Sequence, residues 1–304
     1  MIEKVALIGL GAIGAAVAEQ IVGKGFDFKV IVDEKRKKRY EEEGVYVDGR
    51  AIPFEYLTPG EGRPVDFILV ASKYHDLEEV IGQLRNFVGP RTVIMSLLNG
   101  IDSEEILGGA LGMDHLLHAM IYNIASVRQS NRITRGRPGT IRFGSLRGVE
   151  DPRALMVKEF FDACGIHSIL DGAILQSIWW KFMLNVGVNQ MSAITGATNG
   201  IITAYEEPKK IMELAMIEVV RIAGKKGIPL SESDMYTWYA TSAGLPGDSR
   251  SSMLQDVESR RKTEVEMLSG RVIEMGRELG VPTPVNELLF HAIRLKEKLY
   301  LEKE

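Results

Sequence analysis

Apolar and polar positions follow two different patterns along the chain. Up to about residue 170, short apolar runs bounded by glycine or polar residues alternate with helix-periodic stretches, which is typical of alternating strands and helices. Because parallel strands need long crossover connections, this order predicts a doubly wound, Rossmann-type α/β sheet with helices on both faces. The predicted strands are 5–10, 28–32, 66–71, 92–98, 115–124, 140–144 and 166–170, and the predicted helices are 12–24, 34–43 and 152–163.

From residue 171 onward, long helix-periodic stretches replace the alternation. In the stretch 251–279, apolar residues recur at three- and four-residue steps, which indicates one amphipathic helix. We therefore predict two domains, an α/β domain over 1–170 and an all-helical domain over 171–304. The apolar stripes would suit a homodimer interface as well as a packed monomeric domain. The predicted helices are 173–194, 208–226, 231–243, 251–279 and 284–298.

Composition narrows the class of protein. The chain has 304 residues, and its 37 Lys and Arg against 41 Asp and Glu give a net charge of −4, which offers no overall attraction to nucleic acid or to an anionic membrane surface. No segment has the roughly 20 apolar residues that a membrane span needs. The single cysteine, Cys164, excludes an internal disulfide and a cysteine-rich metal site, so we predict no metal and a cytoplasmic location.

A glycine motif lies between the first predicted strand and the first predicted helix. Gly9, Gly11 and Gly14 have the G-x-G-x-x-G spacing, in which the glycines allow a tight turn, close approach of a pyrophosphate and close packing of helix on strand. The helix N-terminus adds N–H donors for phosphate. We predict that these glycines, with Ala12 and Ile13, bind a nicotinamide dinucleotide; the alternative is a glycine-rich turn without a ligand.

The end of the second predicted strand leaves the choice between NAD and NADP open. Asp33 lies there, where a carboxylate can accept hydrogen bonds from the ribose hydroxyls of NAD. The cationic run 35–39 follows at once, and one or two of its members could clamp the 2′-phosphate of NADP. For most of these cations, a solvated helix face is the simpler interpretation.

Two more polar residues follow predicted strands at the edge where open parallel sheets bind ligands. Lys73 comes just after the strand 66–71, and Asn99 comes just after the strand 92–98. Because the carboxyl ends of parallel strands meet at one edge, both residues are predicted to lie near the glycine motif. Lys73 could pair with a cofactor phosphate or a substrate carboxylate, whereas a simple turn is the alternative at Asn99-Gly100.

The helix predicted over 173–194 carries a polar stripe on an otherwise apolar surface. Lys181, Asn185 and Asn189 recur every four residues and therefore share one face. Buried amides and an ammonium need partners, so a stripe of this kind is typical of a binding site. Transfer of hydride to a ketone leaves an alkoxide, and a partly desolvated lysine can both stabilise and protonate it. We predict this acid to be Lys181, with the two asparagines orienting the substrate.

The same stretch belongs to a set of motifs that closely resembles ketopantoate reductase. The motifs are W-x-K-x-x-x-N-x-x-x-N at 179–189, S-S-M-L-Q-D at 251–256 and K-T-E-V-E at 262–266, and the resemblance extends almost from end to end of the chain. It implies NADPH-dependent reduction of 2-dehydropantoate to (R)-pantoate, a step toward pantothenate and coenzyme A. The resemblance implies that Lys181 is the general acid and that Glu264 supports the substrate or the lysine. It also implies that the substrate is bound by Asn185, Asn189 and Ser252, and that the cofactor and the cleft are lined by Lys73 and Asn99.

The residues alone leave other interpretations. Ser252 could be a helix N-cap, and Glu264 could be an exposed carboxylate beside Arg260 or Arg261.

The sequence departs from the family pattern at two places. Asp33 and Glu34 stand where NADPH-using members commonly carry arginine, and the segment 115–123 lacks the expected glycine-containing strand. In that segment His115 and His118 could be polar groups near the substrate, but satisfied structural histidines are the simpler interpretation, since no third metal ligand is apparent. The alternative functions are an NADH-dependent reductase of another branched or aromatic 2-oxo acid and a non-catalytic nicotinamide-sensing regulator.

Overall fold

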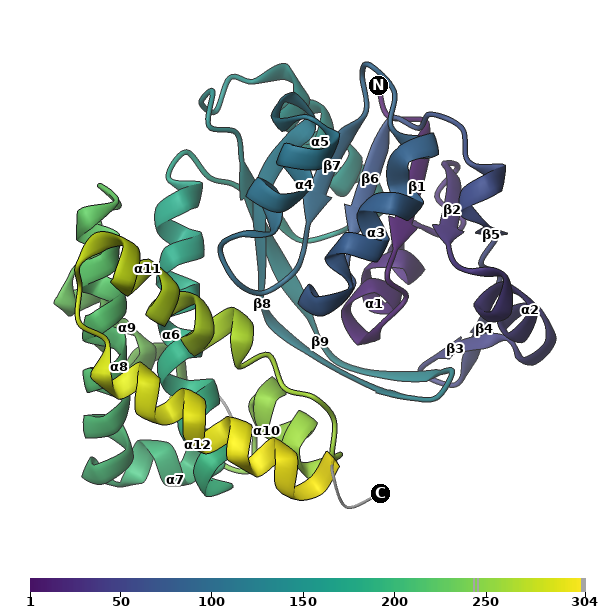
Figure 1. Cartoon of the computed structure of the whole chain (residues 1–304). Coiled ribbons are helices and arrows are strands. Elements are labelled where there is room, and N and C mark those ends of the chain that lie inside the picture. Colours follow the sequence, from purple (N-terminus) through teal and green to yellow (C-terminus); the bar gives the residue numbers. More distant parts are fainter. Residues whose placement is uncertain (243, 245, 302–304) are drawn as a thin grey trace. The chain divides into compact units, whose positions relative to one another are not determined.

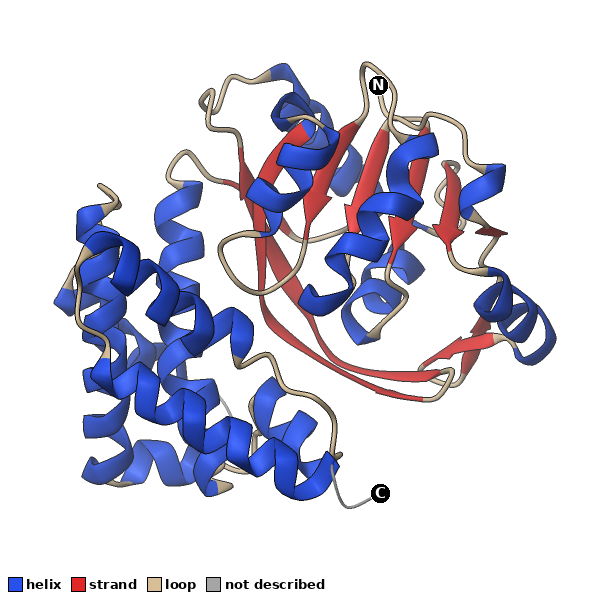
Figure 2. Ribbon diagram, viewed as in Figure 1, coloured by secondary structure: helices blue, strands red, loops and turns tan. Residues whose placement is uncertain are grey.

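The first of two compact units, Met1–Ile174, is built on a sheet whose central strands β6 and β7 are buried along their whole length. The computed structural model describes residues 1–242, 244 and 246–301. Six neighbouring strands run parallel in the order β5-β2-β1-β6-β7-β8 (Figures 1 and 2). Their bounds are Lys4–Ile8 for β1, Asp27–Ile31 for β2, Tyr56–Leu57 for β5, Phe67–Val70 for β6, Val93–Ser96 for β7 and Leu116–Gln129 for β8.

Helices cover this sheet on both faces, as the alternating pattern predicted. Alternate residues of β1 point to opposite faces: Val5 and Leu7 pack in one apolar cluster with α1 and α5, whereas Ala6 and Ile8 pack in another with α3 and α4. The predicted fold class is therefore confirmed, although α3 and α4 were not predicted. The helices are α1 Ala12–Ile21, α2 Glu34–Glu43, α3 Leu77–Leu84, α4 Ser103–Leu111 and α5 Pro152–Cys164, with single 3₁₀ turns at Pro59–Glu61, Tyr74–Asp76, Arg85–Phe87 and Met113–His115.

A long antiparallel hairpin extends the sheet beyond the predicted strands. β8 pairs with β9, Arg132–Gly144, and the two strands leave the sheet as a curved ribbon that reaches β3, Val45–Val47 (Figure 1). The predicted strands 115–124 and 140–144 cover only the buried part, because the outer part is arginine-rich and its side chains are mostly exposed. β3 also pairs with β4, Arg50–Ile52, and β9 pairs with β10, Ser168–Leu170.

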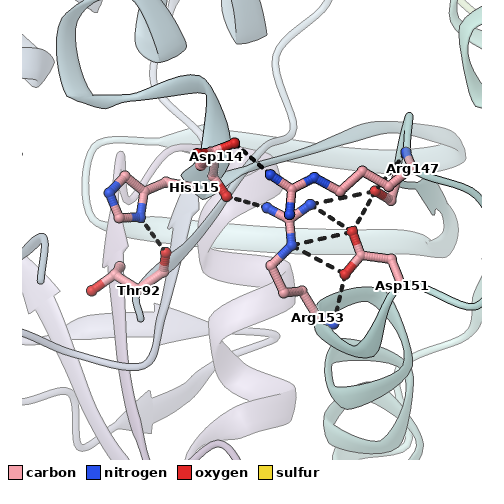
Figure 3. A network of polar contacts seen from close by, with 7 residues as sticks. Thr92, Asp114, His115, Arg147, Asp151 and Arg153 are labelled. Carbon is pink, nitrogen blue, oxygen red and sulfur yellow. Dashed lines mark hydrogen bonds and ion pairs between the residues drawn. The ribbon is translucent and has the colours of Figure 1, made fainter. Parts of the chain in front are cut away.

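A polar network ties α5 to the segment that enters β8 (Figure 3). Asp151 is the N-cap of α5 and accepts a hydrogen bond from the backbone N–H of Arg153 at 2.9 Å. The Arg153 guanidinium bonds both this carboxylate and the carbonyl oxygen of Asp114, and it holds the pKa of Asp151 well below its usual range. Nδ1 of His115 lies 2.7 Å from the carbonyl oxygen of Thr92, so His115 is a satisfied structural residue, as expected.

The second unit, from Leu175 onward, is helical in all its described regular structure, as predicted. The single helix predicted over 251–279 is wrong, because the helix that begins at Ser252 ends at Glu258, and Arg260 after it has a left-handed φ of +52°. Arg261 donates a hydrogen bond to the buried carboxylate of Asp256, with Nε at 2.9 Å from Oδ1. This pairing holds the turn after the helix against the helix itself. The helices are α6 Ile174–Thr195, α7 Asn199–Ala204, α8 Glu206–Lys225, α9 Glu232–Ser242, α10 Ser252–Glu258, the π-helical segment Glu266–Gly270, α11 Arg271–Leu279 and α12 Pro284–Leu301.

Among the described residues, no helix has both the length and the apolar character needed to cross a bilayer.

Candidate active site

The three motif glycines differ in whether the surrounding structure requires glycine at their position. Gly9 has φ of +95°, and a Cβ there would overlap the backbone of Ala71 and Ser72; a Cβ at Gly14 would overlap the carbonyl oxygen of Gly9. A Cβ at Gly11, in contrast, would meet nothing closer than the Ala71 oxygen at 3.9 Å. Packing therefore requires the first and third glycines but not the second, which leaves open space in front of the backbone at the start of α1.

A buried hydroxyl without a partner lies beside this turn. Ser72 follows β6, and its Oγ has no hydrogen-bond partner among the described residues. An orphaned buried hydroxyl is costly unless a ligand or water satisfies it. Together with the open backbone at Gly11 and the N–H groups of α1, this donor set suits the phosphates and hydroxyls of a dinucleotide. The residues present therefore fit the predicted cofactor.

Asp33 is the N-cap of α2. Its Oδ1 accepts a hydrogen bond from the backbone N–H of Arg36 at 2.7 Å, and its Oδ2 lies 3.2 Å from NH1 of the same arginine. Lys37, the next cation of the run, pairs with Glu61 at 2.8 Å and lowers the pKa of that carboxyl to about 2. These two cations are thus held by carboxylates, while the Asp33 side chain stays 38% exposed and accessible.

The loops that carry Lys73 and Asn99 lie at the same edge as the glycine turn. β1, β6 and β7 are adjacent parallel strands, and the backbone N–H groups of Ala71 and Leu97 continue their ladders by bonding Ile8 and Val70, each at 2.8 Å. Lys73 is exposed and Asn99 is half-buried. The backbone therefore places both residues at the carboxyl edge of the sheet, as the order of strands predicted.

Two residues at the glycine turn were missed by sequence reasoning. Arg128 of β8 donates hydrogen bonds to the carbonyl oxygen of Leu10 and, at 2.8 Å, to the hydroxyl of Tyr40. Ser126 donates to the carbonyl oxygen of Ala12 at 3.1 Å. Among the described residues, no carboxylate pairs with the Arg128 guanidinium. In the sequence, these two residues are indicated by no more than a weak alternation of apolar and polar positions after residue 124. Their contacts with the glycine turn form because the long hairpin reaches that turn.

A buried acid is linked through Ser103 to the last residue of β7, Ser96, after which the chain leads to Asn99. Glu104 of α4 is buried, and its carboxyl accepts hydrogen bonds from Ser103 Oγ at 2.8 Å and from the backbone N–H of Ala119 at 3.3 Å. Ser103 also bonds Ser96 Oγ at 2.8 Å. Burial raises the pKa of Glu104 to about 7. The same edge of the sheet therefore holds an ionisable group that sequence reasoning did not predict.

His118 departs from the expected satisfied histidine. It is buried in β8, burial lowers its pKa, and its Nδ1 has no hydrogen-bond partner among the described residues. Both observations favour a neutral imidazole.

In the helical unit, α6 is a buried helix with the predicted polar stripe. Trp179 and Phe182 are buried and their rings pack edge to face with centroids 6.1 Å apart. Lys181 and Asn185 are half-buried on the stripe, and Asn189 is buried. The helix thus keeps an ammonium and two amides in a mostly apolar environment, which strengthens their electrostatic interactions with any bound polar group.

Ser252 meets this stripe at its C-terminal end. Asn189 Nδ2 lies 3.4 Å from Ser252 Oγ, which brings two predicted substrate-binding residues together. The interpretation of Ser252 as an N-cap is wrong, because Ser251 caps α10 by accepting the backbone N–H of Leu254 at 3.2 Å. Of the two adjacent serines, Ser251 therefore caps α10, whereas the side chain of Ser252 contacts the polar stripe.

Glu264 lies in the break between α10 and the π-helical segment, not on a continuous helix. The preceding Thr263 donates hydrogen bonds from its N–H and Oγ1 to the carboxylate of Glu297, at 2.7 and 2.6 Å. Glu264 is half-buried, and the neighbouring Arg261 is paired with Asp256. Glu264 is therefore not the exposed carboxylate of the alternative interpretation.

Comparisons with known proteins cover nearly the whole chain. The 2-dehydropantoate 2-reductase of Halobacterium salinarum is 25% identical over 303 residues, covering 97% of this chain and 99% of the relative. Among solved structures, D-mandelate dehydrogenase with NADH and anilino(oxo)acetate has a TM-score of 0.88 at 20% identity, covering 98% of this chain and 99% of that one. The dimeric ketopantoate reductase of Staphylococcus aureus has a TM-score of 0.80 at 21% identity, covering 98% and 99%.

Two family models match the two halves of the chain. The model "Ketopantoate reductase PanE/ApbA" matches residues 5–148, and "Ketopantoate reductase PanE/ApbA C terminal" matches residues 173–297. The resemblance inferred from the motifs is therefore confirmed, and the chain belongs to the ketopantoate reductase family of oxidoreductases.

Proposed function

We propose that this protein reduces 2-dehydropantoate to (R)-pantoate with a nicotinamide cofactor, in the biosynthesis of pantothenate and coenzyme A. The observation that carries the proposal is the polar stripe of the buried helix α6, where Asn189 meets Ser252 at 3.4 Å. The coverage of the chain by both family models supports it. The bound nicotinamide supplies the hydride.

The side chains of the helical unit supply the remaining chemistry. The half-buried Lys181 holds a proton on Nζ and delivers it to the substrate oxygen as negative charge develops there. Asn185, Asn189 and Ser252 orient the carbonyl, hydroxyl and carboxylate groups of the substrate through hydrogen bonds. Glu264 supports the substrate or the lysine. Partial burial of the stripe reduces the contact of these groups with water, which increases the effect of each charge.

The cofactor is proposed to lie across the carboxyl edge of the sheet. Its pyrophosphate would be held by the backbone from Gly9 to Gly14, including Ala12 and Ile13, at the N-terminus of α1. Asp33 would face the adenosine ribose, and Lys73 and Asn99 would bind farther along the edge. The family favours NADP, whereas the Asp33 carboxylate also suits the ribose hydroxyls of NAD.

A second candidate substrate is an aromatic or another branched 2-oxo acid, reduced with NADH. The accessible carboxylate of Asp33 favours it, because a negative charge beside the ribose disfavours a 2′-phosphate. A fold likeness to D-mandelate dehydrogenase, solved with NADH and anilino(oxo)acetate, points in the same direction. Both candidates use the same lysine chemistry.

We propose a cytoplasmic location and a homodimer as working predictions. The single cysteine is compatible with a reducing compartment, and the Staphylococcus aureus relative is dimeric. Light scattering of the purified protein measures the assembly directly.

The proposed function is tested by the oxidation of NADPH and NADH in the presence of 2-dehydropantoate, 2-oxoisovalerate and phenylglyoxylate. The highest kcat/KM for 2-dehydropantoate would support the first candidate, and the highest value for phenylglyoxylate with NADH would support the second. Tight cofactor binding without turnover of any 2-oxo acid would contradict both and favour a nicotinamide-sensing regulator.

A further inference from the structure

A line of four polar side chains crosses the core of the helical unit. Ser269 donates a hydrogen bond to Gln190 Oε1, Gln190 Nε2 donates to Asn286 Oδ1 at 3.2 Å, and Asn286 Nδ2 donates to Glu218 Oε2 at 2.7 Å. Ser269, Gln190 and Asn286 are completely buried, and Glu218 is nearly so. Gln190 Nε2 also donates to the carbonyl oxygen of Val186 at 2.7 Å, and Asn286 Nδ2 also donates to that of Ala215 at 3.1 Å. These additional acceptors fix the orientation of both amides.

The charged end of the line caps a helix. The Glu218 carboxylate of α8 also accepts the backbone N–H groups of Val285 and Asn286, at 2.9 and 3.0 Å, in the first turn of α12. A carboxylate at a helix N-terminus is stabilised by the unpaired N–H groups and the helix dipole. This cap fixes α12 against α8 and makes Asn286 a rigid acceptor for Gln190.

Stability alone does not account for such a network. Hydrogen bonds between buried neutral groups add only about 1 kcal/mol each, and replacing both partners by apolar groups of similar shape can be nearly neutral. What an apolar core cannot supply is a defined pairing between particular residues of different helices. The network therefore specifies the rotation and the register of the elements that it joins.

The neutral end of this network, the bond between Ser269 and Gln190, joins the two elements that carry the proposed catalytic residues. Gln190 directly follows Asn189 on α6, whereas Ser269 lies in the π-helical segment that begins after Glu264. In this segment the N–H of Leu268 bonds the carbonyl oxygen of Glu264 at 3.0 Å, and the N–H of Gly270 bonds that of Val265 at 3.0 Å. A π-helical turn holds one residue more than an α-turn and is often found at functional sites.

We propose that Gln190 and Ser269 form a positioning pair that holds the π-helical segment, and with it Glu264, in register with Lys181 and Asn189 of α6. The pair touches neither substrate nor cofactor, and its role rests on the proposed function of those three residues. Without the Ser269 bond, the segment can relax toward an ordinary α-turn, which rotates the backbone that carries Glu264. The pair should therefore affect turnover and leave dinucleotide binding unchanged.

The test compares Ser269→Ala, Gln190→Leu and the double variant with wild type. Ser269→Ala leaves Gln190 Oε1 unpaired, whereas Gln190→Leu leaves both Ser269 Oγ and Asn286 Oδ1 unpaired, so both variants should have a lower Tm than wild type. The double variant removes the unpaired Ser269 hydroxyl and should have a higher Tm than Gln190→Leu. We expect kcat of the double variant to stay at least tenfold below wild type, with KM for the dinucleotide within twofold. Thr195→Ala is the matched control and should keep wild-type kcat, because it removes the hydroxyl of an exposed residue that bonds only backbone groups at the end of α6, those of Met191 and Ala197.

Wild-type kcat in a folded double variant, assayed below its Tm, would overturn the positioning role. If the double variant does not fold, Ser269→Ala assayed below its Tm decides, and unchanged kcat overturns the proposal. Amide hydrogen exchange over 263–270 gives a second measurement without turnover: faster exchange in the variants than in wild type or Thr195→Ala is expected, and unchanged protection overturns the proposal. Failure of the proposed function is distinct, because it would show as wild-type protein without turnover of any 2-oxo acid.

Discussion

Asp33 accepts a hydrogen bond from the backbone N–H of Arg36 at 2.7 Å and pairs with the guanidinium of the same residue at 3.2 Å. The residue proposed to choose the cofactor is therefore also the N-cap of α2. A substitution at this position changes two properties at once unless the new side chain can also cap the helix.

Asp33→Ser separates cofactor choice from helix capping. Serine caps as well as aspartate, so the free energy of unfolding should stay close to wild type while the carboxylate is lost. We expect the ratio of kcat/KM with NADPH to that with NADH to rise about tenfold, since a hydrogen bond to a charged group contributes about 1.5–3 kcal/mol. Asp33→Arg should shift the ratio further, at a cost of about 1 kcal/mol for the lost cap. An unchanged ratio in both variants would show that Asp33 does not contact the ribose.

Gly11→Ala and Gly14→Ala form a matched pair for the cofactor site. A methyl group at Gly11 meets nothing closer than 3.9 Å, whereas one at Gly14 overlaps the Gly9 carbonyl oxygen. We expect Gly11→Ala to keep its wild-type Tm and to raise KM for the dinucleotide at least tenfold. Gly14→Ala should lower Tm because helix and strand must separate. Normal cofactor affinity in Gly11→Ala would mean that no ligand approaches the backbone there.

Lys181→Ala tests the proposed general acid. The alkoxide formed by hydride transfer would lose its proton donor, and kcat should fall by about 10²- to 10⁴-fold. Cofactor affinity, measured by quenching of protein fluorescence, should change little. Lys210→Ala removes an exposed lysine of α8 that pairs with Glu213 at 3.6 Å, and as a control it should keep wild-type turnover. A loss of less than tenfold in Lys181→Ala would exclude this residue as the acid.

The fold could be predicted where hydrophobic periodicity reflects burial on a regular element. The fully buried strands β6 and β7 and the half-buried helix α5 lie within a few residues of their predicted bounds. The outer part of the β8–β9 hairpin could not be predicted, because its stability comes from pairing with β3 and from Arg128 at the glycine turn. Long-range pairs of this kind leave no local pattern in a sequence.

The candidate site shows the same limit. The stripe of Lys181, Asn185 and Asn189 could be predicted because a single helix defines it. The break at Arg260 could not, since the left-handed residue is not a glycine and the reversal depends on the ion pair between Asp256 and Arg261. Gln190 and Ser269 likewise have no common motif, and only the packed helices bring them together.

Glu104 should make stability depend on pH between about 4.5 and about 7. Burial raises the pKa of its carboxyl from 4.5 in the unfolded chain to about 7, so the folded protein holds this proton more tightly. Its contribution is therefore fully present below pH 4.5 and is lost as the pH rises through 7. Glutamine resembles the protonated acid and does not ionise. Measured by urea unfolding, Glu104→Gln should gain stability relative to wild type as the pH rises, by roughly 3 kcal/mol at pH 8.

The control for this prediction is Glu105→Gln, which removes the exposed carboxyl next to Glu104. The pH dependence of its stability between 4.5 and 8 should follow that of wild type, because Glu104 keeps its buried carboxyl in this variant. A constant difference between Glu104→Gln and wild type from pH 4.5 to 8 would mean that Glu104 ionises inside the fold without penalty. In that case the hydrogen bonds from Ser103 and Ala119 would outweigh its desolvation.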